Sequence, residues 1–114
     1  MKLISGLLPL LIPKVLAEMA GTFAVIFVGS GSILLAERFP HSFPAIGVPL
    51  AWAFIIGLMI TALGDISGAH FNPAVTLAFV AAKKFPLSYM PVYWGSQFLG
   101  GLLAVGLLAV IQKI

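Results

Sequence analysis

The stretch SGAHFNPAVT, residues 67–76, holds the residues whose types and spacing most suggest chemistry. His70 is one of two histidines, Asn72 is the only asparagine in the chain, and Pro73 follows it directly. Proline has no amide hydrogen and is tolerated in the first turn of a helix, so we expect a helix to begin at Pro73 with Asn72 as its N-cap. Residues 67–71 are then extended or irregular.

Such a loop offers carbonyl acceptors beside the free N–H groups of a helix N-terminus. The positive end of the helix favours the oxygen of a water molecule and disfavours a cation or a relayed proton. Asn72 adds a side-chain amide donor at the same place. The pattern therefore indicates a pore lining.

Other kinds of site lack the residues that they need. No nucleophile–base set and no ligand cluster is apparent, so we expect no catalytic residue, no metal and no cofactor. Cysteine is absent, which excludes disulfides and thiolate chemistry. The six basic residues form no continuous face, so we expect no nucleic-acid partner.

The composition of the chain predicts that this stretch lies within a membrane protein. The 114 residues are 61% hydrophobic and 8% charged, against about 25% charged in ordinary soluble domains. Residues 19–36, 39–64 and 85–112 contain no Asp, Glu, Lys or Arg, and each run reaches the roughly 18–20 residues that cross a lipid bilayer. We expect an all-α membrane protein with three transmembrane helices, at about residues 15–36, 48–63 and 88–111.

The segment between the second and third of these helices, residues 65–82, is too short to be a fourth. From Pro73 to Ala82 a helix would be about 15 Å long, half of a hydrocarbon core about 30 Å thick. If this segment enters the bilayer and returns, four of the six basic residues lie on one side. The positive-inside rule then favours a re-entrant half-helix in a multi-pass protein of the cell membrane, with its N-terminus in the cytoplasm. These four are Lys2, Lys14, Lys83 and Lys84; Arg38 and Lys113 lie opposite.

The N-terminal residues 1–17 resemble a signal peptide in composition. However, Pro9 and Pro13 interrupt the apolar stretch and Lys14 precedes the candidate cleavage position. We therefore expect residues 1–13 to be an interfacial segment that leads into the first helix.

Small and aromatic residues predict how the helices sit. Two lines at i, i+4, i+8 spacing are expected to form helix–helix contacts, since small residues let helices approach closely in lipid. The lines are Ala53, Gly57 and Thr61 on the second helix, and Ser96, Gly100 and Ala104 on the third. Aromatic rings near the start of the third helix suit the membrane–water boundary: Tyr89, Tyr93 and Trp94.

Three motifs, in this order, resemble the aquaporin and glycerol-facilitator (major intrinsic protein) channels. AEMAGTF at residues 17–23 resembles the signature of their first helix, SGAHFNPAVT their first Asn-Pro-Ala loop, and YWGSQFLGG at residues 93–101 the start of their third helix. The resemblance covers about residues 15–111. It implies a passive channel for water or for small neutral solutes such as glycerol.

The resemblance also implies a role for individual residues. The pore motif would be Asn72, Pro73 and Ala74, and the carbonyl ladder would be Gly68, Ala69, His70 and Phe71. The pore wall and selectivity constriction would include Val25, Ile56 and Trp52, while Glu18 would brace the loop. Three alternatives remain open: Trp52 as an interfacial belt residue, Glu18 as a side chain reaching the membrane surface, and His70 as a proton relay or ligand.

The family's channels contain two inverted halves, and this chain corresponds to one. A second Asn-Pro-Ala motif and the arginine beside it are missing. We expect a fragment or half-gene that needs a second inverted half, from the same chain or from another subunit, and the resemblance implies a tetramer. A non-conducting assembly module is the alternative. A coupled transporter would need ionisable residues inside the bundle, and Glu18 is the one candidate.

Overall fold

All 114 residues are described by a computed structural model, and every regular element in it is helical. The elements are α1 (Lys2–Arg38), α2 (Gly47–Ser67), α3 (Pro73–Ala81), the 3₁₀ turn η1 (Leu87–Tyr89) and α4 (Met90–Gln112). Three stretches are long and apolar enough to cross a membrane: α1, α2 and the combined η1–α4 segment. The predicted all-α class with three membrane-crossing helices is confirmed.

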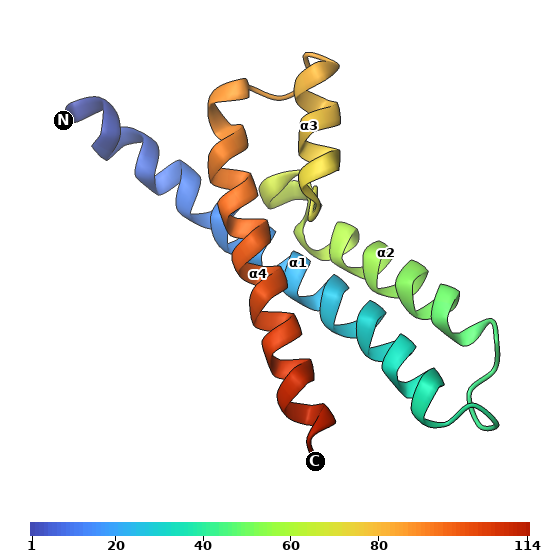
Figure 1. The fold of residues 1–114 in the computed structure, drawn as a ribbon. Coiled ribbons are helices and arrows are strands. Elements are labelled where there is room, and N and C mark those ends of the chain that lie inside the picture. The colour runs from blue at the N-terminus through green and yellow to red at the C-terminus, as the bar shows by residue number, and fades with distance from the viewer.

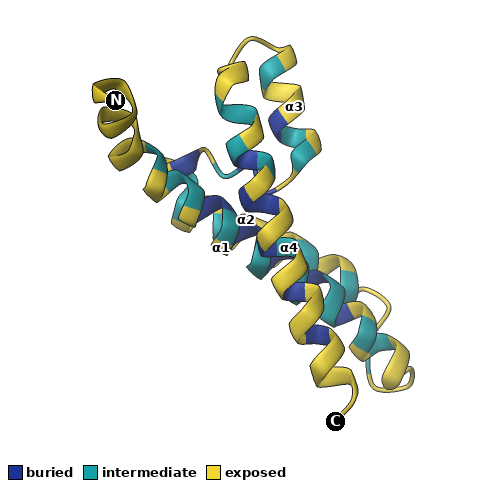
Figure 2. Ribbon diagram, turned by 60° about the vertical axis from the view of Figure 1, so that its left-hand side comes forward, coloured by how far each residue is buried: buried dark blue, intermediate teal, exposed yellow.

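Helix α1 lies at the centre of the arrangement and packs against both α2 and α4, while α3 packs against α4. Both ribbon views place the turn between α3 and α4 at the same end of the molecule as the N-terminus (Figures 1 and 2). The α1–α2 loop and the C-terminus lie at the opposite end. Helix α3 thus starts near the middle of the molecule and runs back toward the end from which α1 began.

The predicted start of the first helix near Val15 is wrong. Helix α1 begins at Lys2 and continues without interruption through Pro9 and Pro13 to Arg38, 37 residues or about 55 Å. The first ten residues are exposed and extend past the bundle (Figure 2). Leucine and isoleucine dominate this stretch, and prolines inside apolar helices are tolerated when the neighbouring backbone adjusts. The expected break between a lead-in segment and the helix is therefore absent.

The other helix boundaries lie closer to those expected. Helix α2 ends at Ser67, four residues beyond the predicted Leu63, because Gly68 terminates it in a left-handed conformation with φ of 89°. Helix α3 ends at Ala81, one residue short of the prediction, which is within the usual uncertainty of helix ends. The last helical stretch, 87–112, includes the predicted 88–111.

One of the two predicted lines of small residues forms a helix contact. Ser96, Gly100 and Ala104 are buried, and a Cβ at Gly100 would lie 2.3 Å from the carbonyl oxygen of Met19. The backbones of α1 and α4 therefore meet there. The line on α2 (Ala53, Gly57 and Thr61) is exposed, and a Cβ at Gly57 would meet nothing within 4 Å, so the predicted contact does not exist within this chain.

A line of the same spacing on α1 was not predicted. Gly21, Val25 and Gly29 share one face of the helix, and a Cβ at Gly21 would fall within 2.0 Å of the Phe71 ring. Val25 belongs to a small apolar cluster with Ile55 and Phe71. This face of α1 thus receives side chains from α2 and from the loop before α3.

The burial pattern is the reverse of that in a soluble protein. The exposed surface carries many large apolar side chains, while most of the buried polar residues lie where α1, α4 and the loop before α3 meet. Figure 2 shows where the buried residues lie along the helices. The buried polar residues are Glu18, Thr22, Ser32, Ser67, His70, Thr76, Ser96 and Gln97. Apolar surface outside and a polar interior are the distribution that lipid surroundings require.

Candidate functional site

The loop between α2 and α3 has an unusual backbone. Gly68, Ala69 and Phe71 all adopt positive φ angles, of 89°, 53° and 53°. For residues with a side chain this region costs about 1–3 kcal/mol each. The surroundings must therefore hold the loop in place.

The N–H groups of the loop are all bound. Gly68 N–H donates to the Gly64 carbonyl at 2.8 Å and Ala69 N–H to Ser67 Oγ at 3.1 Å. His70 N–H and Phe71 N–H donate to the two oxygens of Glu18, at 3.0 and 2.8 Å. Every loop amide from 68 to 71 thus has a partner.

The carbonyls of the same residues have none. No hydrogen bond within the chain reaches the carbonyl oxygens of residues 68–71. In this loop, therefore, the four backbone N–H donors are bound by the protein, while the four backbone carbonyl acceptors have no partner. Unpaired carbonyls must be satisfied by another molecule.

Glu18 is the centre of the contacts that hold the loop. Its side chain is fully buried and accepts four hydrogen bonds. Besides the two loop amides, Ser67 Oγ donates to Oε1 at 2.7 Å and Gln97 Nε2 to Oε2 at 2.8 Å. Glu18 does not reach the surface of the molecule, which removes one of the alternatives for this residue.

A second group of contacts ties the loop to α3 and α4. The Thr76 hydroxyl lies 2.9 Å from His70 Nδ1 and accepts a hydrogen bond from Gln97 Nε2 at 2.9 Å. The His70 ring is buried and stacks on Phe79, with ring centres 4.7 Å apart. Its side chain thus packs inside the chain.

Two aromatic residues expected at the membrane boundary instead bind the backbone of this region. Tyr93 is completely buried, and its hydroxyl donates to the Ser67 carbonyl at 2.5 Å. Trp94 Nε1 donates to the Pro73 carbonyl at 3.0 Å. Tyr93 is thus buried inside the chain and not at an exposed boundary position as predicted, whereas the half-buried Trp94 bonds to the first residue of α3.

Asn72 caps α3 as expected. Its side-chain oxygen accepts from Ala74 N–H at 2.8 Å, and Pro73 is the first residue of the helix. The residue is exposed, and its side-chain NH₂ group has no partner in the chain. A free amide donor therefore stands beside the unpaired carbonyls of residues 68–71.

The three residues predicted to line a pore wall occupy different environments. Ile56 is 39% exposed, whereas Val25 is buried at 7% because Ile55 and Phe71 pack over it. Trp52 is half-buried beside Gly29. Of these three side chains, Val25 is the one that borders no open surface of this chain.

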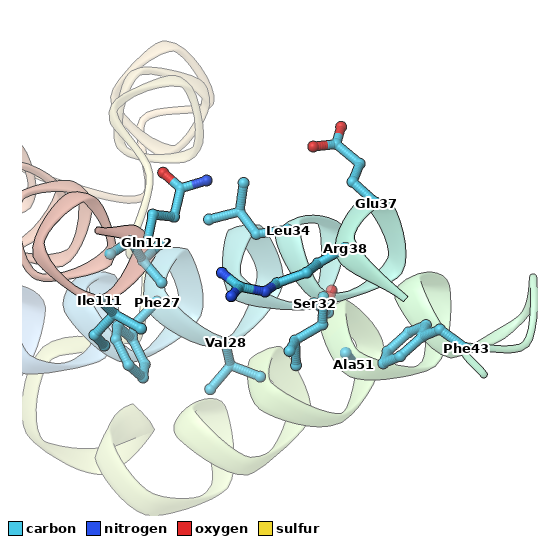
Figure 3. Close-up of a pocket in the computed structure, with 13 residues that line it drawn as sticks. Phe27, Val28, Ser32, Leu34, Glu37, Arg38, Phe43, Ala51, Ile111 and Gln112 are labelled. Atoms are coloured by element: carbon cyan, nitrogen blue, oxygen red, sulfur yellow. The ribbon is translucent and has the colours of Figure 1, made fainter. Parts of the chain in front are cut away.

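A cavity of about 750 Å³ lies at the other end of the molecule, among α1, α2 and α4. Figure 3 shows apolar side chains such as Val28 and Ile111 around it, with Arg38 directed toward it and Glu37 directed away. None of the predicted site residues lines this cavity. It is separate from the loop that Glu18 holds.

Sequence reasoning predicted the loop and its brace Glu18 but missed the other residues that support the loop. Ser67, Thr76 and Tyr93 all bond to it or to its neighbours, and two of them lie within the quoted motifs SGAHFNPAVT. Polar residues inside otherwise apolar helices were the signal that could have identified them, because such groups need a buried partner.

Comparison with known proteins agrees with these features. The sequence model of the family described as "Major intrinsic protein" matches residues 9–114. The chain is 39% identical over 100 residues to aquaporin NIP3-1 of Arabidopsis thaliana, which covers 88% of this chain and 31% of that protein. It is 41% identical over 100 residues to aquaporin NIP1-1 of Oryza sativa subsp. japonica, covering 88% of this chain and 35% of the relative. Nodulin-26 of Glycine max is 38% identical over 98 residues, covering 86% and 36%.

The chain spans about a third of the length of the curated relatives it matches (31%, 35% and 36% for these three). The family match, by contrast, covers nearly the whole chain. This chain therefore belongs to the major intrinsic protein family, whose aquaporins are membrane channels and not enzymes.

Proposed function

We propose that this chain forms the first half of a passive channel for water, small neutral solutes such as glycerol, or both. The observation that carries the proposal is that the backbone N–H groups of residues 68–71 are bound within the chain while their carbonyls are not. The four carbonyls without partners belong to consecutive residues, and Asn72, the next residue, adds a free amide donor. A chain of small hydrogen-bonding molecules can replace the missing partners one after another.

The same arrangement disfavours ions. Helix α3 is nine residues long, about 14 Å, and its positive end lies at Asn72. A cation near this end is repelled by the positive end of the helix dipole. The four carbonyls of one loop also offer fewer oxygen ligands than the rings of carbonyls that replace the hydration shell of K⁺ in potassium channels. Neutral solutes carry no such penalty.

The proposed topology has α3 as a re-entrant half-helix on the cytoplasmic side of the cell membrane. The turn between α3 and α4, with Lys83 and Lys84, then shares a side with the N-terminus and Lys14. Lys14 Nζ also donates to the Ile66 carbonyl at the end of α2, which places this lysine beside the loop. The positive-inside rule supports this orientation.

In the complete channel, a second inverted half supplies the facing half-helix, from the same chain or from another subunit. Asn72, Pro73 and Ala74 meet it at the centre of the path, and Trp52 and Ile56 border the path on one side. Complete pores assemble as tetramers.

Osmotic swelling of proteoliposomes tests the proposal. Three preparations are compared: protein-free vesicles, the chain alone, and the chain joined to the part of nodulin-26 that it does not match. We expect water permeability well above the lipid baseline for the joined protein. The Asn72→Ser variant keeps an acceptor for the helix N-terminus but removes the free amide, so we expect lower permeability; Ser42→Ala in the exposed α1–α2 loop is the control. Baseline permeability in a folded joined protein would overturn the proposal and favour a non-conducting assembly module.

The topology has its own test, helped by the lack of cysteine in the chain. Single cysteines at Ser42 and Ser88 are labelled from outside with a reagent that does not cross membranes. We expect Ser42→Cys to react and Ser88→Cys to be protected in intact cells. Equal labelling of both positions would mean that residues 65–82 cross the bilayer completely.

A further inference from the structure

Gly29 on α1 lies directly against the indole ring of Trp52 on α2. A Cβ at Gly29 would be 2.4 Å from Cδ2, 2.4 Å from Cε2 and 2.6 Å from Cε3 of that ring. Three adjacent ring atoms at nearly equal distance place the missing side chain above the face of the ring. The indole therefore lies flat on the backbone of α1.

A side chain at position 29 would have to displace the whole indole, because the helix is held on both sides and the ring cannot bend. Helix α1 packs between α2 and α4, and Ser32 Oγ donates to the Gly29 carbonyl at 2.6 Å. The opposing atoms belong to the fused part of a rigid ring rather than to the end of a flexible chain. Ordinary contact begins at 3.4 Å, so a methyl group at Gly29 would displace the ring by about 1.0 Å (3.4 minus 2.4).

We propose that Gly29 is a positioning residue that sets the width of the conduction path by letting Trp52 withdraw against α1. The inference rests on the proposed channel function, in which Trp52 borders the path. With a side chain at position 29, the indole must move away from α1 and toward the path. The narrowing affects a solute the size of glycerol more than it affects water.

Tryptophan fluorescence tests the contact in the chain as it stands. The chain has two tryptophans, so Trp94→Phe leaves Trp52 as the only emitter. In that background, Gly29→Ala is expected to shift the emission maximum of Trp52 and to increase its quenching by acrylamide in proteoliposomes. Gly106→Ala is the matched control, because a Cβ there meets nothing within 4 Å.

Permeability tests the consequence in the chain joined to the remainder of nodulin-26. One added methyl group in a fitted passage changes discrimination by roughly tenfold or more. We expect Gly29→Ala to lower the ratio of glycerol to water permeability by about that factor. In a Trp52→Phe background the smaller ring leaves room for the methyl group, so the same substitution should leave the ratio unchanged. A lesion of the fold alone would not be rescued in this way.

The outcomes separate the inference from the function on which it rests. Unchanged Trp52 emission, or an equal fall of the ratio in the Trp52→Phe background, overturns the role of Gly29. A joined channel that conducts both solutes with an unchanged ratio in Gly29→Ala also overturns it, while leaving the channel function in place. A folded joined protein with no flux overturns the proposed function, and the role of Gly29 with it.

Discussion

Replacement of Glu18 by glutamine should loosen the loop before α3 while leaving the helices formed. Each carboxylate oxygen accepts two hydrogen bonds, and each oxygen serves one loop amide: Oε1 that of His70 and Oε2 that of Phe71. An amide side chain has one oxygen and one NH₂ group, so the NH₂ group must face one of these two backbone donors. Ser67 can turn its hydroxyl to accept, and Gln97 can turn its amide, but a backbone N–H cannot change its role.

The size of the effect follows from these contacts. A buried backbone donor left without a partner costs about 1–3 kcal/mol. The two bonds that remain on the glutamine oxygen lose their charged acceptor, which weakens each by about 1 kcal/mol. The free energy of unfolding should therefore fall by about 3–5 kcal/mol, a large share of the usual total of about 5–15 kcal/mol.

Two measurements check this prediction. Denaturant unfolding in detergent micelles, followed by circular dichroism, gives the free energy of unfolding, and Glu37→Gln is the control because Glu37 is exposed. Amide hydrogen exchange at His70 and Phe71 reports on the loop directly, and one of the two should lose its protection. If Glu18→Gln and Glu37→Gln unfold alike and both loop amides stay protected, the assignment of Glu18 as the holder of this loop is refuted.

Three further substitutions test the contacts of α4 and the end of α2. Gly100→Ala should destabilise the protein by about 1–3 kcal/mol, because the added Cβ would lie 2.3 Å from an α1 carbonyl oxygen. Gly101→Ala is the control, because a Cβ there has no atom within 4 Å, and thermal unfolding compares the two variants. Tyr93→Phe removes a buried hydroxyl hydrogen bond and should lower the free energy of unfolding by about 1 kcal/mol. The Tyr89 hydroxyl bonds to no other group of the chain, so Tyr89→Phe should have little effect, and denaturant midpoints compare the two variants. Lys14→Met removes the hydrogen bond from Lys14 Nζ to the Ile66 carbonyl and should increase amide hydrogen exchange at the end of α2. Unchanged exchange would show that this bond does not stabilise the end of α2.

The helices were predictable because lipid imposes strong rules on sequence. Runs without charge and the Asn72–Pro73 cap identified three long helices and the start of α3, all of which the structure contains. The start of α1 was not predictable from Pro9 and Pro13, because proline weakens a helix without always ending it in apolar surroundings. Local sequence does not reveal whether neighbouring turns can absorb the lost hydrogen bond.

The loop was identified from its residues and Glu18 from the family resemblance, but the other residues that support the loop were not identified. Tyr93 and Gln97 lie 26 and 79 positions from their partners Ser67 and Glu18, a pairing that no local pattern reveals. Tyr93 was assigned to the membrane boundary on its residue type, and the structure buries it instead. Contacts between distant positions depend on how the helices pack, which local sequence patterns do not determine.

The contacts of Glu18 also constrain the order in which the molecule can be completed during synthesis. Its carboxylate is made first, the loop amides follow 52 and 53 residues later, and Gln97 follows 79 residues later, on α4. The loop amides are therefore synthesised before the Gln97 amide that completes the set of bonds to Glu18. Residues 68–71 can be held by the full set of Glu18 contacts only after α4 has been inserted beside α1.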